Sequence, residues 1–162
     1  MAISVGDVLP AAKLQKVGAE GPEVVDLNAW AANSKIAVFA VPGAFTETCS
    51  TVHVPSFIRN AEKFRAKGVA EIVCVSVNDI FVMDAWSRNT GAGAAGIHLL
   101  ADGDSSFTKA MGMVFTAAPV GLINRSRRYA MLVEDGTITV LEIEASPGEC
   151  SISGGESLLE KI

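Results

Sequence analysis

The stretch that decides the fold runs from residue 36 to residue 77, beginning IAVFAV (36–41) and ending IVCVSV (72–77). Both runs are continuously apolar, which is typical of strands buried on both faces of a sheet. Between them, apolar residues recur on one face of a helix, at Val54, Phe57, Ile58, Ala61 and Phe64. Lys67-Gly68 then supply a basic last turn and a glycine that ends the helix. A strand, a helix and a strand in this order predict a βαβ unit with a right-handed crossover.

Helices and strands continue to alternate on the C-terminal side of this unit. Asn78-Asp79 is a typical helix N-cap, and Asp135-Gly136 is the two-residue signal of a type I′ hairpin. The expected elements are a helix over 81–89, a loop over 91–96, a short strand at 97–100, a helix near 107–111, strands at 128–134 and 137–143, and a closing helix at 156–162. The order β-α-β-α-β-α-β-β-α predicts an α/β, thioredoxin-like fold in which helices flank a central mixed sheet.

Length and composition indicate one folded domain and exclude two classes of partner. At 162 residues, of which 49% are hydrophobic and 19% charged, the chain is expected to form a single domain over residues 1–162. The formal net charge is −5, and the densest basic cluster, residues 125–128, is too small for a nucleic-acid footprint. The longest uncharged run, residues 110–124, is 15 residues long and is interrupted by glycine and proline. A membrane-spanning helix needs about 20 mainly apolar residues, so we expect neither nucleic acid nor membrane as a partner.

The cysteines and the N-terminal residues bear on the cellular compartment. Cys49, Cys74 and Cys150 are odd in number and widely spaced, which argues against a secreted disulfide framework. Residues 1–7 contain neither the basic nor the apolar region of a secretory signal. We therefore expect a reducing compartment, namely the cytoplasm or an organelle reached with a transit peptide that is later removed.

Cys49 follows the first buried strand and lies at or near the start of the next helix. The thiolate is the reactive form of cysteine, and unpaired N–H groups at a helix N-terminus stabilise an anion. Pro55, six residues further on, predicts either a kink or a second helix start. A lone cysteine in such a position is more often a small buried apolar residue, so the residues around Cys49 decide between the two interpretations.

Those residues have side chains suited to support a reactive thiolate. Thr46 lies three residues upstream, so its hydroxyl can fold back onto the sulfur and donate to a peroxide oxygen. Pro42 has a rigid ring and no N–H group, which suits it to shield a pocket from water. His53 is expected to line the pocket or to form a hydrogen bond rather than to carry protons, and His98 is expected to be structural. With two histidines, three cysteines and no Cys-x-x-Cys pair, a metal site is not expected.

The segment PGAFTETCS at residues 42–50, together with HVP at 53–55 and SVND at 76–79, resembles the peroxiredoxins. It is similar in particular to their atypical two-cysteine, type II (peroxiredoxin-5-like) branch, and the similarity extends from residues 5–7 to the C-terminal helix. The family motif Pro-x-x-x-Thr-x-x-Cys is matched in full. The resemblance implies a thiol-specific peroxidase that reduces hydrogen peroxide and alkyl hydroperoxides through a sulfenic acid on Cys49, with no metal or organic cofactor.

The resemblance also implies further site residues. The family requires an arginine distant in sequence, which corresponds to Arg128, and its guanidinium would favour the thiolate and hold the peroxide oxygens. Arg125 and Arg127 are expected to be solvated neighbours, and Ser56, where the branch usually has glycine, is expected to affect only the pocket rim. The catalytic set is then Pro42, Thr46, Cys49 and Arg128, and the pocket walls are Gly43, Phe45, Thr48 and His53.

The sulfenic acid must be resolved by a thiol, and two cysteines could supply it. Cys150 lies in residues 146–151, a loop with glycine and proline that can move readily. It also matches the resolving cysteine of the animal peroxiredoxin-5-like proteins. Cys74 lies in the middle of the strand at 72–77, and bridging requires Cα atoms within about 7 Å, so Cys74 is the second choice. The resemblance keeps it open, because some type II members use a cysteine at this position. A one-cysteine cycle reduced by an external thiol stays open as well.

The partners implied by the resemblance are a thiol reductant (thioredoxin, glutaredoxin or glutathione) and a second copy of the chain, with the active-site loop at the interface. Phe45 is the exposed aromatic residue expected to contact the second subunit, while Phe81 and Trp86 are expected in the core or on a dimer face. A thiol–disulfide oxidoreductase is the first alternative, but it would need cysteine where Thr46 stands. A non-catalytic thioredoxin-fold binding module is the second, and it gives no reason for the four residues of the catalytic set to occur together.

Overall fold

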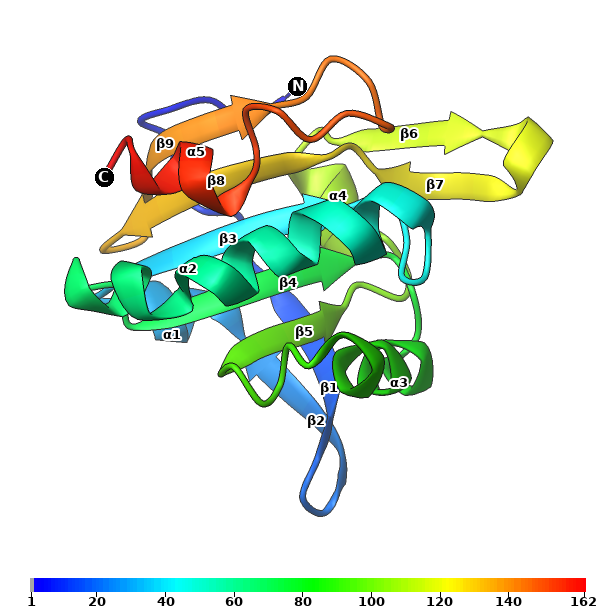
Figure 1. Cartoon of the computed structure of the whole chain (residues 1–162), viewed down its shortest axis with the longest axis horizontal. Helices are drawn as coiled ribbons and strands as arrows, with labels where there is room; N and C mark the ends of the chain where they lie inside the picture. The colour runs from blue at the N-terminus through cyan, green and yellow to red at the C-terminus, as the bar shows by residue number, and fades with distance from the viewer. Residues whose placement is uncertain (1) are drawn as a thin grey trace.

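The computed structural model describes residues 2–162 and contains a seven-stranded central sheet (Figure 1). The strands of this sheet are β1 (Lys13–Gly18), β2 (Gly21–Asp26), β3 (Lys35–Val41), β4 (Glu71–Ser76), β5 (Ile97–Ala101), β8 (Tyr129–Glu134) and β9 (Thr137–Ile143). They follow the order β2-β1-β5-β4-β3-β8-β9. β3 pairs in parallel with β4, and β4 with β5, whereas the remaining pairs are antiparallel. The expected mixed sheet is confirmed.

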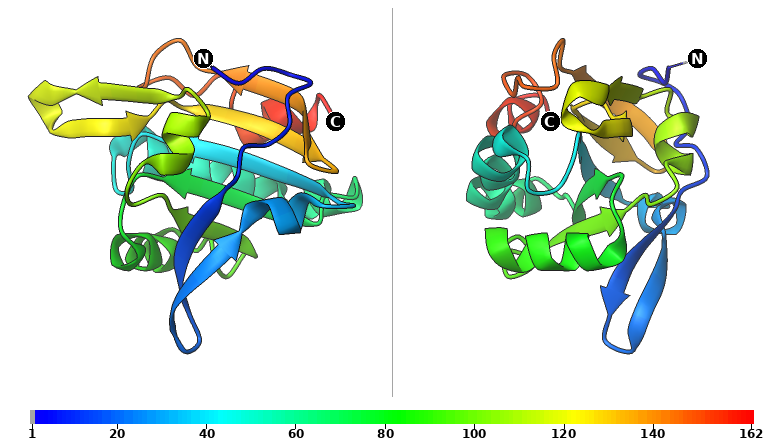
Figure 2. Two further views of the ribbon diagram at one scale, coloured as in Figure 1. Left: turned by 180° about the vertical axis from the view of Figure 1, so that it is seen from behind. Right: turned by 90° about the vertical axis from the view of Figure 1, so that its right-hand side faces the viewer.

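Helices cover both faces of the sheet, as Figure 2 shows from behind and from one side. One face carries α2 (Val54–Ala66), α3 (Ile80–Thr90) and α5 (Gly155–Leu159), and the other carries α1 (Leu27–Ala31) and α4 (Ser106–Ala110). Along β3, Phe39 joins the core beneath α2 while Val38 joins the core on the opposite face. Burial on both faces explains the continuous apolar run. Across residues 2–162, none of the helices has both the length and the apolar character needed to cross a membrane.

The helix-ending glycine, the helix N-cap and the tight turn occur where the sequence predicts them. β3, α2 and β4 form the βαβ unit, and Gly68 follows α2 with a φ of 87°, a conformation that favours glycine. The Asp79 side chain accepts hydrogen bonds from two backbone N–H groups in the first turn of α3, each at 2.9 Å. Asp135 and Gly136, with φ values of 47° and 77°, form the tight turn between β8 and β9.

Two hairpins and the short helix α1 were not predicted from the sequence. β1 and β2 form the first hairpin, and β6 (Val114–Ala117) and β7 (Leu122–Ser126) form the second, joined by a 3₁₀ turn at Ala118–Val120. The β6–β7 pair forms a sheet of its own that projects past the end of the main sheet (Figure 1). Apolar side chains such as Ile123 remain exposed in it, so the burial pattern that marks a strand is weak here.

Candidate active site

Cys49 lies where the chain turns from the end of β3 into α2. It is the first residue of a short π-helical turn, Cys49–His53, in which the Val54 N–H bonds to the Cys49 carbonyl. Residues 47–48 and α2 are helical on either side of this turn, so Pro55 lies within one continuous helical run that the π-helical turn interrupts, and it does not mark a separate helix start. The Cys49 side chain is fully buried, and the thiol is therefore enclosed at an N-terminal turn, as the sequence predicts.

Arg128 contacts the Cys49 sulfur although the two residues are 79 positions apart. Its Nη2 donates to Cys49 Sγ at 3.1 Å, and its Nη1 donates to His53 Nδ1 at 2.9 Å. Nε and Nη2 also donate to the Pro147 carbonyl, at 3.2 and 2.9 Å. All three guanidinium nitrogens are thus held in place, and the cation is positioned to stabilise an anionic sulfur.

His53 is a buried neutral histidine that orients Arg128. Since Nδ1 accepts from Arg128, Nε2 carries the hydrogen, which it donates to the Ser153 carbonyl at 2.8 Å. Burial and then the nearby Arg128 charge lower the pKa of His53 to about 3. The side chain is therefore a hydrogen-bonding residue rather than a proton carrier, and it lies behind Arg128 instead of lining the pocket.

Acidification from pH 7 to pH 5 is expected to destabilise the protein through His53. The unfolded chain binds a proton near pH 6.5, whereas the folded chain does so only near pH 3. Stability is therefore complete above the unfolded pKa and falls as the pH drops through this window. At about 1.4 kcal/mol per pH unit, the loss between pH 6.5 and pH 5 is about 2 kcal/mol. Urea unfolding at pH 7 and pH 5 measures it.

The matched controls for this pH effect are the two histidine variants. His53→Gln should lose most of the dependence, because glutamine does not titrate. His98→Gln should retain it, since His98 lies elsewhere in the fold, paired with Glu71 at 2.7 Å. Equal pH dependence in wild type and His53→Gln would contradict the assignment.

The pocket beside Cys49 brings together part of the predicted set. It has a volume of about 390 Å³ and is lined by Pro42, Thr46, Glu47, Thr48, Ala117, Val120, Leu122, Arg128, Pro147 and Gly148. Gly43, also expected as a pocket wall, is not among these residues, and neither is Phe45. Phe45 has a φ of 63° at the tip of the loop and its side chain is exposed. Three of the lining residues, Ala117, Val120 and Leu122, belong to the β6–β7 hairpin, so the hairpin supplies pocket walls that the sequence did not predict.

Two expectations about the loop are corrected by the structure. The Thr46 hydroxyl donates to the Gly43 carbonyl at 2.8 Å instead of folding onto the sulfur. Arg125 is half-buried and lies against the loop, with Nη1 3.4 Å from the Pro42 carbonyl, so it is not a freely solvated neighbour. A Cβ on Gly43 would lie only 2.8 Å from Arg125 Nη1, so a larger residue here would require the Arg125 side chain to shift.

The other two cysteines differ sharply in accessibility. Cys150 is half-buried in the segment between β9 and α5, and the Ser153 hydroxyl lies 3.9 Å from its sulfur. Cys74 lies inside β4, fully buried, with β3 and β5 paired on either side. Burial raises the pKa of both thiols, that of Cys74 well above its usual range. All three cysteines are free thiols.

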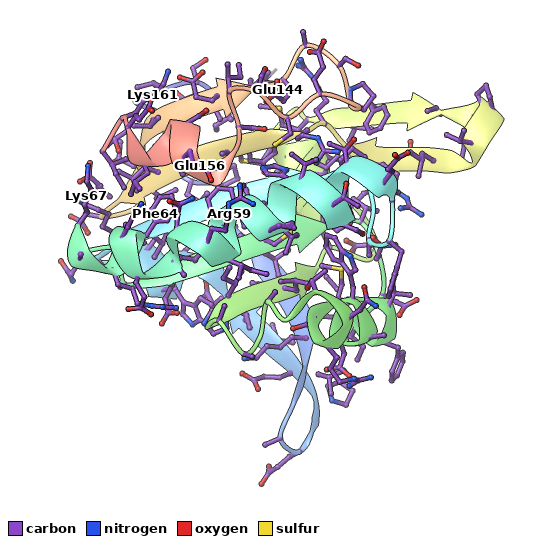
Figure 3. The ribbon with its side chains drawn as sticks, in the orientation of Figure 1. Arg59, Phe64, Lys67, Glu144, Glu156 and Lys161 are labelled. Carbon is purple, nitrogen blue, oxygen red and sulfur yellow. The ribbon has the colours of Figure 1, made fainter. Side chains whose placement is uncertain are left out.

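Apart from Cys150, the contacts made by residues 144–154, the segment from β9 to α5, were not predicted from the sequence. Figure 3 shows Glu144 beside the loop that leads from β9 to α5, and its carboxylate binds three backbone N–H groups of this segment. The expectation for Ser56 is also corrected. Its hydroxyl donates to the His53 carbonyl at 2.6 Å and accepts from the Gly155 N–H at 2.8 Å. It anchors the segment rather than forming the pocket rim. No sequence periodicity marks these residues.

The site contains no cluster of metal ligands. Over residues 2–162, His, Cys, Asp and Glu side chains do not gather in groups of three that could hold a metal ion. The groups at Cys49 are instead the Arg128 guanidinium, the neutral imidazole that holds it and the backbone carbonyl of Pro147. Such an arrangement can stabilise an anionic sulfur and bind a small polar substrate beside it.

Comparisons with known proteins agree with this arrangement. Residues 4–159 match the family model described as Redoxin. The chain is 45% identical to "Peroxiredoxin-2E-2, chloroplastic" of Oryza sativa subsp. japonica, covering 99% of this chain and 72% of that protein. The structure of reduced Prx3 from Vibrio vulnificus with hydrogen peroxide has 42% identity and a TM-score of 0.91, covering 98% of both chains. Peroxiredoxin 5 from Alvinella pompejana has 30% identity and a TM-score of 0.83, covering 98% of this chain and 96% of that one. Since these similarities span nearly its whole length, the chain belongs to the peroxiredoxins of the type II, peroxiredoxin-5-like kind, and it is a thiol peroxidase.

Proposed function

We propose that the chain works as a single peroxiredoxin domain in which the Cys49 sulfur attacks the O–O bond of a peroxide. The observation that carries this proposal is the 3.1 Å hydrogen bond from Arg128 Nη2 to the buried Cys49 Sγ. The thiolate bonds to one peroxide oxygen, the O–O bond breaks, and the other oxygen leaves as water or alcohol after taking up a proton. The sulfur is thereby oxidised by two electrons to a sulfenic acid.

The walls of the pocket support both hydrogen peroxide and alkyl hydroperoxides as substrates. Arg128 supplies polar donors at the sulfur, while Val120, Leu122 and Pro147 supply apolar surface that suits an alkyl group. The Thr46 hydroxyl needs only to rotate away from the Gly43 carbonyl to donate to a bound peroxide oxygen. Pro42 adds an apolar wall without an N–H group.

Cys150 is proposed as the resolving cysteine. It is half-buried in an irregular segment, whereas Cys74 lies in the same buried cluster as Cys49 but is fully buried within β4, which is paired on both sides. The Cys150 segment already touches the active-site loop, because the Thr48 hydroxyl donates to the Gly148 carbonyl at 3.1 Å. The Cys150 thiolate would attack the sulfenic sulfur and form a disulfide, the S–O bond would break, and the hydroxide would leave as water after taking up a proton.

One equivalent of peroxide is therefore expected to yield an intramolecular Cys49–Cys150 disulfide with Cys74 free. Peptide mapping of the oxidised, non-reduced protein measures the pairing. A Cys49–Cys74 peptide would reverse the assignment. Overoxidised Cys49 without any disulfide would instead point to a one-cysteine cycle completed by an external thiol.

The class of reductant can be inferred from which oxidised form of Cys49 accumulates, the disulfide or the sulfenic acid. A Cys49–Cys150 disulfide favours a dithiol protein such as thioredoxin or glutaredoxin, because reduction then proceeds by thiol–disulfide exchange. A persistent sulfenic acid favours glutathione, which can form a mixed disulfide at Cys49. Peroxide turnover with thioredoxin, glutaredoxin and glutathione in parallel tests the proposed cycle.

A homodimer is proposed from the apolar surface beside the active-site loop. Phe45 is 53% exposed and Phe81 is 71% exposed, whereas Trp86, expected in the core or on a dimer face, is fully buried. The Phe45 ring lies 6.5 Å from Trp86, which belongs to the same helix as Phe81. Exposed aromatic side chains of this kind are typical of a protein–protein interface.

Light scattering at micromolar concentration should give about twice the single-chain mass of 16.9 kDa. Phe45→Glu should shift the mass toward a single chain, because a carboxylate would be desolvated at the interface. A single-chain mass for the unmodified protein throughout the micromolar range would contradict the dimer.

A reducing compartment is proposed as the place of action, since the cycle begins from a free Cys49 thiol. The rice relative is named as chloroplastic, so an organelle is as consistent with the chain as the cytoplasm is.

A further inference from the structure

Glu144, the residue that follows β9, has a buried side chain in an unusually complete set of hydrogen bonds. Its carboxylate accepts from the N–H groups of Ser151, Ile152 and Ser153, at 2.7, 2.8 and 2.8 Å. The hydroxyls of Ser151 and Ser153 add bonds of 3.2 and 2.9 Å. Successive N–H groups that converge on one carboxylate form an anion-binding nest. Burial alone would raise the pKa of Glu144, but the hydrogen bonds from Ser153, Ile152 and Ser151 outweigh it and leave the pKa below its usual value.

An unbroken chain of contacts leads from this carboxylate to the reactive sulfur. The Ser153 carbonyl, held beside the nest, accepts from His53 Nε2 at 2.8 Å. His53 Nδ1 accepts from Arg128 Nη1 at 2.9 Å, and Arg128 Nη2 donates to Cys49 Sγ at 3.1 Å. Glu144 does not itself touch the sulfur, so any effect on the chemistry has to pass through these neighbours.

This chain of contacts matters because the Arg128 side chain would be free to rotate if its neighbours did not hold it. An arginine side chain loses considerable rotamer entropy when it is fixed, and its guanidinium acts on a substrate only when it is held in a productive orientation. The Pro147 carbonyl holds Nε and Nη2 of Arg128, and His53 holds Nη1. His53 is itself held by the Ser153 carbonyl, and the Ser153 N–H is bound by Glu144. Cys150 is the residue immediately before the nest, so the same contacts dock the segment that carries it.

We propose that Glu144 is a positioning residue for peroxide reduction: by gathering residues 151–153 it holds Ser153 and His53 so that Arg128 stays on the Cys49 sulfur. The proposal rests on the proposed roles of Cys49 and Arg128. It differs from a purely structural role, in which Glu144 would only fasten the C-terminal segment.

The test is a double-mutant cycle between Glu144 and Arg128. Glu144→Gln keeps the shape and can place its amide oxygen where Oε1 accepts from the three N–H groups, but it removes the negative charge that strengthens these hydrogen bonds, which loosens the nest. We expect the second-order rate of Cys49 oxidation by hydrogen peroxide to fall about tenfold, as when outer partners of other reactive centres are removed. In an Arg128→Gln background, the same change should alter the rate less than about twofold, because the effect passes through Arg128. Glu149→Gln, at an exposed position in the same segment, is the matched control and should react like wild type.

Each outcome decides the proposal. An unchanged rate for a folded Glu144→Gln protein, or an equal loss in both backgrounds, would overturn it. If Glu144→Gln does not fold by circular dichroism, the Ser151→Ala/Ser153→Ala double variant replaces it, since this removes both hydroxyl bonds but keeps the carboxylate. That variant should react measurably more slowly than wild type, by a factor smaller than ten, and only when Arg128 is present. A wild-type rate would overturn the proposal. Failure of the proposed function is distinguishable, because Arg128→Gln alone would then leave the rate unchanged.

Discussion

Replacing Cys49 by serine is expected to abolish peroxide reduction while leaving the fold intact. A serine hydroxyl is a far weaker nucleophile than a thiolate and is not oxidised by peroxide. The fold should survive because the change removes little volume and the hydroxyl oxygen can still accept from Arg128. The measurement is the peroxide consumed per mole of reduced protein, which should fall to zero.

The matched control is Cys74→Ala. This variant also removes a fully buried thiol, but one inside β4, so it should lower the melting temperature while still consuming the first equivalent of peroxide. Undiminished consumption by Cys49→Ser would move the reactive thiol to another cysteine and refute the proposed site.

Arg128→Gln is expected to slow the reaction of Cys49 with peroxide by a factor of about 10²–10³, the usual cost of removing a preorganised donor to developing charge. The amide keeps hydrogen-bonding capacity toward Pro147 but loses the positive charge at 3.1 Å from the sulfur. Stopped-flow measurement of the second-order rate constant, combined with a melting curve, separates the chemical effect from any loss of stability.

Arg88→Gln is the control for this substitution. Arg88 forms an exposed ion pair with Asp84 on α3, and exposed pairs contribute little to stability. Its rate constant should match that of wild type. An Arg128→Gln rate within twofold of wild type would show that the guanidinium does not act on the reaction.

The regular elements could be predicted because their signals are local. The apolar run at 36–41 is buried on both faces, Asp79 caps α3 through its own neighbours, and the Asp135-Gly136 turn depends on two adjacent φ angles. Each of these features depends on residues within one or two turns of chain, so a single sequence contains the necessary information.

The β6–β7 hairpin could not be predicted for the opposite reason. The β6 and β7 strands pair only with each other, and side chains such as Ile123 stay exposed. Without a buried face, no alternation of apolar and polar residues marks the strands. Their functional contribution, the pocket walls at Ala117 and Leu122, was missed with them.

Within the site, the sequence by itself determined that Cys49 stands at an N-terminal turn after a buried strand, and the motif around it identified the chemistry. Only the tertiary structure decided what surrounds the sulfur. Arg128 meets Cys49 because β8 pairs antiparallel with β3, and Glu144 meets Ser153 because the chain doubles back after β9. These contacts join residues that carry no shared local pattern. Their geometry depends on long-range strand pairing and on buried polar groups finding partners across the fold.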